Sequence, residues 1–96
     1  MGVKTLEAAI ENELVQRVNA MGGIAEKGSV PGRRGFFDRI VVLPGGSVLF
    51  VECKRPQGGR LSAHQILRLD IYRKLGAAVA VVRNSADIDR LLSGYA

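Results

Sequence analysis

Residues 37–54 carry the strongest structural signal in the chain and read FDRIVVLPGGSVLFVECK. Two runs rich in β-branched and aromatic residues, 37–43 and 48–54, flank the turn-forming sequence Pro44-Gly45-Gly46-Ser47. Such runs predict strands, and a short glycine-bearing connection between them predicts an antiparallel hairpin. We therefore expect a β-hairpin in the middle of the fold.

Asp38 and Glu52 are unusual in this hairpin because each carboxylate lies in an otherwise apolar strand. Ionised groups are costly to bury unless they pair with a cation. Side chains alternate between the faces of a strand, so Asp38 faces the same side as Glu52 only if opposed residue numbers sum to an even value. We therefore predict an odd-length turn, such as Leu43 to Ser47, or a bulge at Gly45 or Gly46.

With that register, the two carboxylates can share one Mg²⁺ or Mn²⁺ ion, because both ions prefer oxygen ligands. Alternation also places Lys54 on the side of Glu52 and turns Cys53 toward the core. A metal ion held by carboxylates activates water for phosphodiester hydrolysis, and Lys54 can orient or deprotonate that water or neutralise the phosphate. The alternative is a surface Glu-Lys pair at strand spacing with no catalytic role.

The sequence before the hairpin predicts one helix and one short strand. Thr5 can cap a helix that runs to about Met21 and stops at Gly22-Gly23, and residues 24–27 are a strand candidate. The helix carries an apolar stripe at helical spacing, formed by Leu6, Ile10, Leu14, Val18 and Met21.

The sequence after the hairpin predicts two helices and one strand. Ser62 caps a helix to about Leu75, and Gly76 closes it as the left-handed residue. Residues 77–82 are continuously apolar, so we place this strand inside the sheet, and Ser85 caps a last helix over residues 86–93. The order αβββαβα predicts an α/β fold with a mixed sheet flanked by helices.

Composition limits the possible classes of protein. The chain has 96 residues, 47% hydrophobic, and a net charge of +5, which indicates a single domain spanning 1–96 with affinity for polyanions. One cysteine and one histidine exclude an intrachain disulfide and a Cys/His zinc site. No apolar run reaches the length of a membrane span, so we expect a cytoplasmic protein, and such a small core favours a homodimer.

Two further polar residues are candidates with ordinary alternatives. Glu11 lies on the border of the first helix's apolar stripe, where a glutamate is most often solvated, and Glu7 competes with it one turn earlier. Gln65 follows Ser62 at the spacing of a capping box, and His64 is expected to be a solvated first-turn residue.

Cations gather on both sides of the predicted carboxylate site. They are Lys27, Arg33, Arg34, Arg39, Arg55 and Arg60. If they face one groove, they form a track for the DNA backbone; the alternative is that Arg33 and Arg34 are merely solvated loop residues. The chain offers no ladder of aromatic residues for base stacking, so we expect recognition of backbone and shape rather than sequence.

Five segments together resemble the VRR-NUC family of the PD-(D/E)xK nuclease superfamily, in the short stand-alone form found in phages and bacteria. The segments are Glu11, Gly35-Phe36-Phe37-Asp38-Arg39, Phe50-Val51-Glu52-Cys53-Lys54, Leu61-Ser62-Ala63-His64-Gln65, and Gly76 with Val79-Ala80-Val81-Val82. The resemblance covers nearly the whole chain and implies a restriction-endonuclease-like core. Phe37 replaces the proline of the superfamily name, and Cys53 replaces a more frequent apolar residue, but neither change removes a ligand.

The resemblance implies metal-dependent DNA cleavage and a role for each matched residue. Asp38 and Glu52 would be metal ligands together with the backbone carbonyl of Cys53, and Lys54 would be the catalytic lysine. Glu11 would be the helix acid near the metal, and Gln65 the active-site glutamine. Stand-alone members form dimers with two active sites, as Holliday-junction resolvases do.

We therefore expect a Mg²⁺-dependent endonuclease that selects branched DNA in repair or recombination, with Mn²⁺ able to substitute. The alternatives are a nuclease that nicks flaps or trims ends, and a DNA-binding module whose site no longer catalyses. If a phage encodes the protein, it would act in the host cytoplasm.

Overall fold

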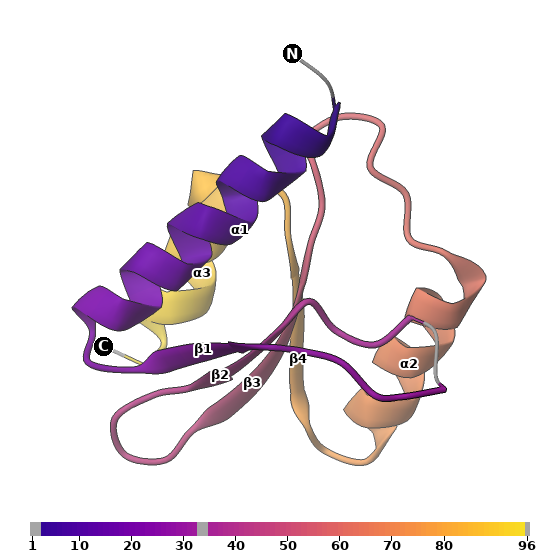
Figure 1. The fold of residues 1–96 in the computed structure, drawn as a ribbon. Coiled ribbons are helices and arrows are strands. Elements are labelled where there is room, and N and C mark those ends of the chain that lie inside the picture. Colours follow the sequence, from indigo (N-terminus) through magenta and orange to yellow (C-terminus); the bar gives the residue numbers. More distant parts are fainter. Residues whose placement is uncertain (1–2, 33–34, 96) are drawn as a thin grey trace.

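The computed structural model of the chain describes residues 3–32 and 35–95. Its elements follow the predicted order αβββαβα (Figure 1). They are α1 (Val3–Ala20), β1 (Ile24–Lys27), β2 (Arg39–Val42), β3 (Val48–Cys53), α2 (Ala63–Lys74), β4 (Ala78–Val82) and α3 (Ser85–Ser93). Within these residues, no helix has the length and apolar character needed to cross a membrane.

The four strands form one mixed sheet in the order β1-β2-β3-β4. The pairs β1/β2 and β2/β3 are antiparallel, whereas β3 and β4 are parallel and are joined through α2. Helices α1 and α3 cover one face of the sheet, and α2 covers the other (Figure 1). The fold is therefore α/β with three layers, as the sequence predicts.

The hairpin between β2 and β3 has the predicted register. Val42 pairs with Val48 and Arg39 with Val51, so opposed residue numbers sum to an even value across a five-residue connection. The Gly46 amide donates to the Leu43 carbonyl at 2.9 Å, and both central glycines have positive φ, 94° at Gly45 and 92° at Gly46. Extending this register by one residue sets position 38 opposite position 52, on the same side of the sheet.

The two faces of the sheet pack differently. On the α1/α3 face, Leu14 and Val18 of α1 and Ile88 of α3 pack with the odd-numbered residues of β3 in one aliphatic core. On the α2 face, Phe36, Phe37, Phe50 and Tyr72 form an aromatic cluster, with the rings of Phe50 and Tyr72 centred 5.0 Å apart. Burying these large side chains fixes α2 against the sheet.

Two predictions about helix starts are wrong. Helix α1 begins at Val3, so Thr5 lies in its first turn rather than at its cap, and Leu6 is 50% exposed instead of buried in the stripe. Asn84, not Ser85, caps α3, because its extended backbone lets its side chain accept the Asp87 amide at 2.8 Å. The hydroxyl of Ser85 instead donates to Glu13 of α1 at 2.7 Å.

The prediction that residues 77–82 lie inside the sheet is also wrong, because β4 is an edge strand. The strand is apolar throughout because α2 packs on one of its faces and α3 on the other, which leaves Ala78 exposed, residues 79–81 half-buried and Val82 buried. A continuous apolar run therefore indicates helices packed on both faces and does not indicate a central position in the sheet.

Candidate active site

The candidate site lies where β3 ends, on the face of the sheet covered by α2. Glu52 is 1% exposed, and its Oε1 atom is buried with no hydrogen-bond partner among the described residues. Asp38 precedes β2 opposite Glu52, and its Oδ2 atom accepts the Cys53 amide at 2.7 Å. The hairpin thus holds two carboxylates together, with one oxygen left unsatisfied.

The electrostatics of this pair favour a cation. Burial, followed by the hydrogen bond to Asp38 and the charge of Asp38, raises the pKa of Glu52 from its ordinary value of 4.5 to about 9. Lys54 lowers this pKa, and Glu7 raises it, so both side chains are close enough to act on Glu52. Without a cation, the Glu52 carboxyl therefore keeps its proton at neutral pH.

A hard divalent cation fits this donor set. Both side chains offer oxygen, and binding would satisfy the buried Oε1 atom of Glu52. In the described ranges, no three or more His, Cys, Asp and Glu side chains form a group that could hold a metal ion. The two carboxylates would therefore need a backbone carbonyl, water or phosphate to complete the coordination shell.

The position of Asp38 depends on close backbone packing by Gly28. The Gly28 amide donates to the Asp38 carbonyl at 2.9 Å. A Cβ atom at position 28 would lie 1.9 Å from the Phe37 carbonyl oxygen, so only glycine fits without moving the backbone. The sequence does not predict this role of Gly28, because close packing between separate segments leaves no local pattern.

Cys53 and Lys54 divide between the two sides of the sheet as predicted. Cys53 is fully buried in the aliphatic core, where burial raises the pKa of its thiol above the ordinary value, so it is not a reactive cysteine. The amide of Lys54 donates to the Val82 carbonyl at 3.0 Å, which continues the β3/β4 ladder by one residue. The charge of Lys54 reaches Glu52 on the α2 side.

The structure separates the two candidate acids of α1. Glu11 accepts hydrogen bonds from Arg39 at 2.7 Å and from Lys27 at 3.0 Å. Its carboxylate is thus neutralised by two cations and joins no metal-binding group among the described residues. Glu7, one turn earlier, is the α1 acid whose charge raises the pKa of Glu52. The role of Glu11 near a metal stays a prediction, and Glu7 becomes a second candidate.

Helix α2 begins with the predicted capping box. The Gln65 amide donates to the Ser62 hydroxyl at 3.1 Å, and the Gln65 side-chain oxygen accepts the Ser62 amide at 2.8 Å. His64 is exposed in the first turn, as expected. Gly35 packs against this turn, since a Cβ atom there would lie 2.5 Å from the His64 Cβ. The loop before Asp38 therefore rests on the start of α2.

The predicted DNA-binding cations have different surroundings. Arg33 and Arg34 lie outside the described residues. The Arg39 side chain is 16% exposed and is held by Glu11 and the Ala25 carbonyl, whereas the Lys27 side chain is 73% exposed. Arg55 donates to the carbonyls of Gln57 and Gly58, both at 2.9 Å, and Arg60 is exposed.

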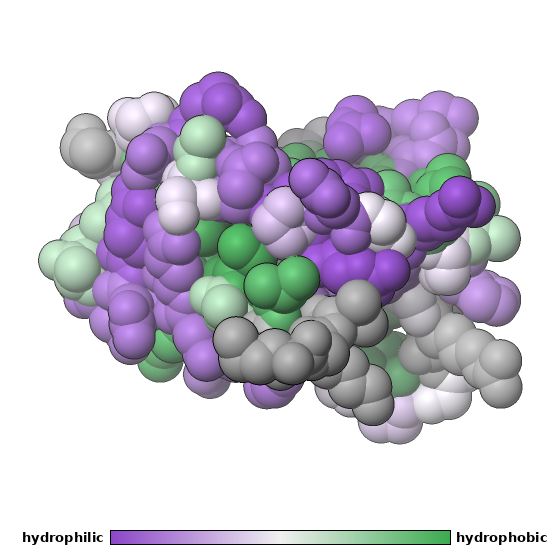
Figure 2. Space-filling model, turned by 90° about the horizontal axis from the view of Figure 1, so that it is seen from above, coloured by the Kyte–Doolittle hydropathy of each residue, from purple (hydrophilic) through white to green (hydrophobic). Residues whose placement is uncertain are grey.

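Hydrophilic residues cover most of the end of the molecule where β3 ends. Figure 2 views this end and shows them on both sides of a small hydrophobic area. A charged ligand that approaches the end of β3 from this side would meet mainly hydrophilic residues.

Comparisons with known proteins find similar chains, among them a phage protein and a solved structure. A protein named "Putative nuclease p44", from Acyrthosiphon pisum secondary endosymbiont phage 1, is 43% identical over 86 residues, which cover 90% of each chain. A solved structure described as a VRR_NUC domain superposes with a TM-score of 0.87 at 34% identity, over 94% of this chain and 97% of the other. No family model matches the sequence.

Proposed function

The chain belongs to the VRR-NUC family of nucleases, and on this premise we propose that it is a metal-dependent DNA endonuclease. The observation that carries the proposal is the Asp38–Glu52 pair, with its buried, unsatisfied Glu52 oxygen and the charge of Lys54 nearby. A structural pair of carboxylates would gain nothing from this arrangement, because each carboxylate raises the cost of ionising the other.

Asp38, Glu52 and the backbone carbonyl of Cys53 would hold Mg²⁺, and Mn²⁺ could replace it because it accepts the same ligands. When bound, the ion supplies a water of lowered pKa and neutralises charge on the phosphate. The Cys53 amide fixes Asp38 by its hydrogen bond, so the carboxylate needs no rearrangement to bind. Lys54 would orient the attacking water or take its proton, and Gln65 with Glu11 or Glu7 would support the site.

The DNA substrate would be bound through its backbone. The net charge of +5 attracts phosphate, and the sequence has no ladder of aromatic residues for base stacking. We propose branched DNA, such as a four-way junction, as the preferred substrate, with a role in repair or recombination in the cytoplasm. Flap nicking and end trimming are the competing activities, and an inactive DNA-binding module is disfavoured by the intact Asp38, Glu52 and Lys54.

A homodimer would place two such sites on one DNA molecule. Helix α2 exposes three large apolar side chains, Ile66, Leu67 and Ile71, and the residue that caps its C-terminus, Leu75, exposes a fourth. In α3, by contrast, Ile88 and Leu92 are buried in the protein's own core. We therefore place the dimer contact on α2 and the adjacent edge strand β4, and sedimentation of the Leu67→Glu variant tests it, since a monomer should result.

The decisive experiment incubates purified protein with end-labelled duplex, flap and four-way-junction DNA, with and without Mg²⁺, beside Lys54→Ala. Cleavage should require the ion and favour the junction. Lys54→Ala should fold and bind DNA but cleave it more slowly by several orders of magnitude. DNA binding without any metal-dependent cleavage by the wild-type protein would instead identify a binding module.

A further inference from the structure

Arg68 is a polar residue of α2 that neither the family motifs nor the site described above includes. Its Nε atom is buried and has no hydrogen-bond partner among residues 3–32 and 35–95. The only other buried side-chain atom in this condition there is Oε1 of Glu52. One is a donor and the other an acceptor, yet they are not bonded to each other.

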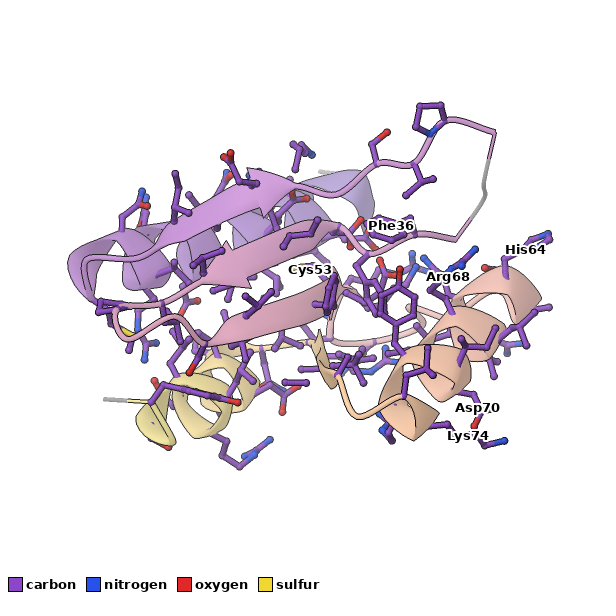
Figure 3. The ribbon with its side chains drawn as sticks, turned by 90° about the horizontal axis from the view of Figure 1, so that it is seen from below. Phe36, Cys53, His64, Arg68, Asp70 and Lys74 are labelled. Carbon is purple, nitrogen blue, oxygen red and sulfur yellow. The ribbon has the colours of Figure 1, made fainter. Side chains whose placement is uncertain are left out.

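Arg68 faces the sheet. The least exposed residues of α2 are Gln65, Arg68, Leu69 and Tyr72, whose spacing of three, four and seven residues defines one side of the helix. Figure 3 shows Arg68 on the side of α2 nearest the sheet, whereas the exposed residues His64, Asp70 and Lys74 project away from it. The guanidinium therefore enters the layer that also contains the Asp38–Glu52 pair.

The packing of α2 sets Arg68 level with Glu52. Because α2 connects the parallel strands β3 and β4, it runs antiparallel to both (Figure 1). Tyr72 contacts Phe50, with ring centres 5.0 Å apart. From that contact, one turn back along α2 is about 6 Å and reaches Arg68. Two residues forward along β3 is about 6.6 Å and reaches Glu52.

The chemistry of this position calls for an anion. A guanidinium stays charged at any accessible pH, and its planar fork of donors matches phosphate oxygens. A buried hydrogen-bond donor without a partner destabilises the fold, so a ligand that accepts this hydrogen bond removes that destabilisation. A phosphate held at the Asp38–Glu52 pair would meet Arg68 from the helix side.

We infer that Arg68 is a further catalytic residue, which binds a non-bridging oxygen of the scissile phosphate and stabilises the negative charge that develops there during hydrolysis. The inference rests on the proposed nuclease function. It also makes a prediction about stability that a structural arginine does not share, because removing an unpaired buried donor should not weaken the fold.

The test compares wild type, Arg68→Gln, Arg68→Lys and the exposed control Arg90→Gln in single-turnover cleavage of a four-way junction at saturating protein. Arg68→Gln should cleave about 10²- to 10³-fold more slowly, because the transition-state anion loses one hydrogen-bond donor. Arg90→Gln should cleave at the wild-type rate. Arg68→Lys should fall between them, because lysine keeps the charge but not the fork. The melting temperature of Arg68→Gln should equal or exceed that of wild type.

Two results would overturn the inference while the proposed function stands. The first is cleavage by Arg68→Gln at the wild-type rate beside an inactive Lys54→Ala. The second is a melting temperature of Arg68→Gln several degrees below wild type, which would make Arg68 a structural residue. Failure of the wild-type protein to cleave any DNA with Mg²⁺ would overturn the proposed function as well.

Discussion

At the scale of single residues, the buried carboxyl of Glu52 links protonation to folding. Its pKa is about 9 in the folded, metal-free chain and 4.5 when unperturbed, so the folded state holds a proton that the unfolded state loses. Between these two values the unfolded state binds fewer protons, and stability must fall as pH rises. This is the opposite of the trend for a carboxylate stabilised by a salt bridge.

We therefore expect the unfolding free energy in EDTA to decrease from pH 5 to pH 8.5, at a slope approaching about 1.4 kcal/mol per pH unit. Glu52→Gln should remove most of this slope, and the exposed control Glu26→Gln should retain it. Urea titrations monitored by circular dichroism measure the effect. A wild-type slope that survives in Glu52→Gln would assign the proton to another group.

Gly28 gives a second residue-scale prediction. An alanine Cβ at this position would lie 1.9 Å from the Phe37 carbonyl, so Gly28→Ala must displace the backbone that carries Asp38. We expect a loss of about 1–3 kcal/mol in stability and a larger loss in cleavage. Gly94→Ala is the matched control, because its Cβ would lie 3.9 Å from the Leu91 carbonyl oxygen, an ordinary contact distance. Normal cleavage by Gly28→Ala would show that Asp38 tolerates the shift.

The sequence predicts the Asp38–Glu52 pairing because a strand has a period of two, which leaves each carboxylate only two possible faces. It does not distinguish Glu7 from Glu11, because residues four apart lie on the same flank of a helix. How close the carboxylate of Glu7 or Glu11 comes to Glu52 depends on the angle at which α1 crosses the sheet. The sequence gives no signal for Arg68 for a similar reason, because only the packing of α2 on the sheet shows that the Nε atom has no hydrogen-bond partner among the described residues.

At the scale of elements, the start of α2 combines helix capping with the candidate site. Gln65 closes the capping box with Ser62 and is half-buried on the side of α2 that faces the sheet. Glutamate closes the same box as glutamine does, so Gln65→Glu preserves the cap while changing the chemistry. This substitution separates the two roles that the sequence left open.

We expect Gln65→Glu to keep the wild-type melting temperature and to cleave DNA at least about tenfold more slowly, because a third acid disturbs the carboxylate pair. Ser62→Ala should instead lower stability by about 1 kcal/mol through loss of the cap. Thermal melts and single-turnover cleavage measure both quantities. Unchanged cleavage by Gln65→Glu would leave Gln65 as a capping residue only.

The boundaries of helices and strands were predictable where the local sequence fixes them, and not where packing between elements does. The turn between β2 and β3 and the closure of α2 at Gly76 follow from glycines with positive φ. The edge position of β4 does not follow from its sequence, because helices on both faces make an edge strand as apolar as a central one. Asn84 and Ser85 are both good caps, and the backbone of the preceding strand selects Asn84.

At the scale of the whole molecule, the question is how much of the positive charge is free to meet DNA. The net charge is +5, but internal hydrogen bonds and ion pairs occupy some of the cations near the site. Arg39 is paired with Glu11, and Arg55 bonds to its own loop. Lys27 also pairs with Glu11, but its side chain is 73% exposed, and Arg60 is exposed as well, so these two are better placed to contact phosphates than Arg39 and Arg55 are.

We therefore expect the double variant Lys27→Gln/Arg60→Gln to reduce the slope of log Kobs against log salt by about two units, one for each lost phosphate contact. Arg39→Gln should leave the slope unchanged but destabilise the fold, because Glu11 would lose its part-buried partner. Fluorescence anisotropy in the Lys54→Ala background measures DNA binding without cleavage. Lys74→Gln is the control, because Lys74 is exposed and lies far from the two carboxylates in the sequence. If the double variant keeps the full slope while Arg39→Gln reduces it, the DNA track must run over the α1 side of the sheet, and the pairing of Arg39 with Glu11 must open when DNA binds.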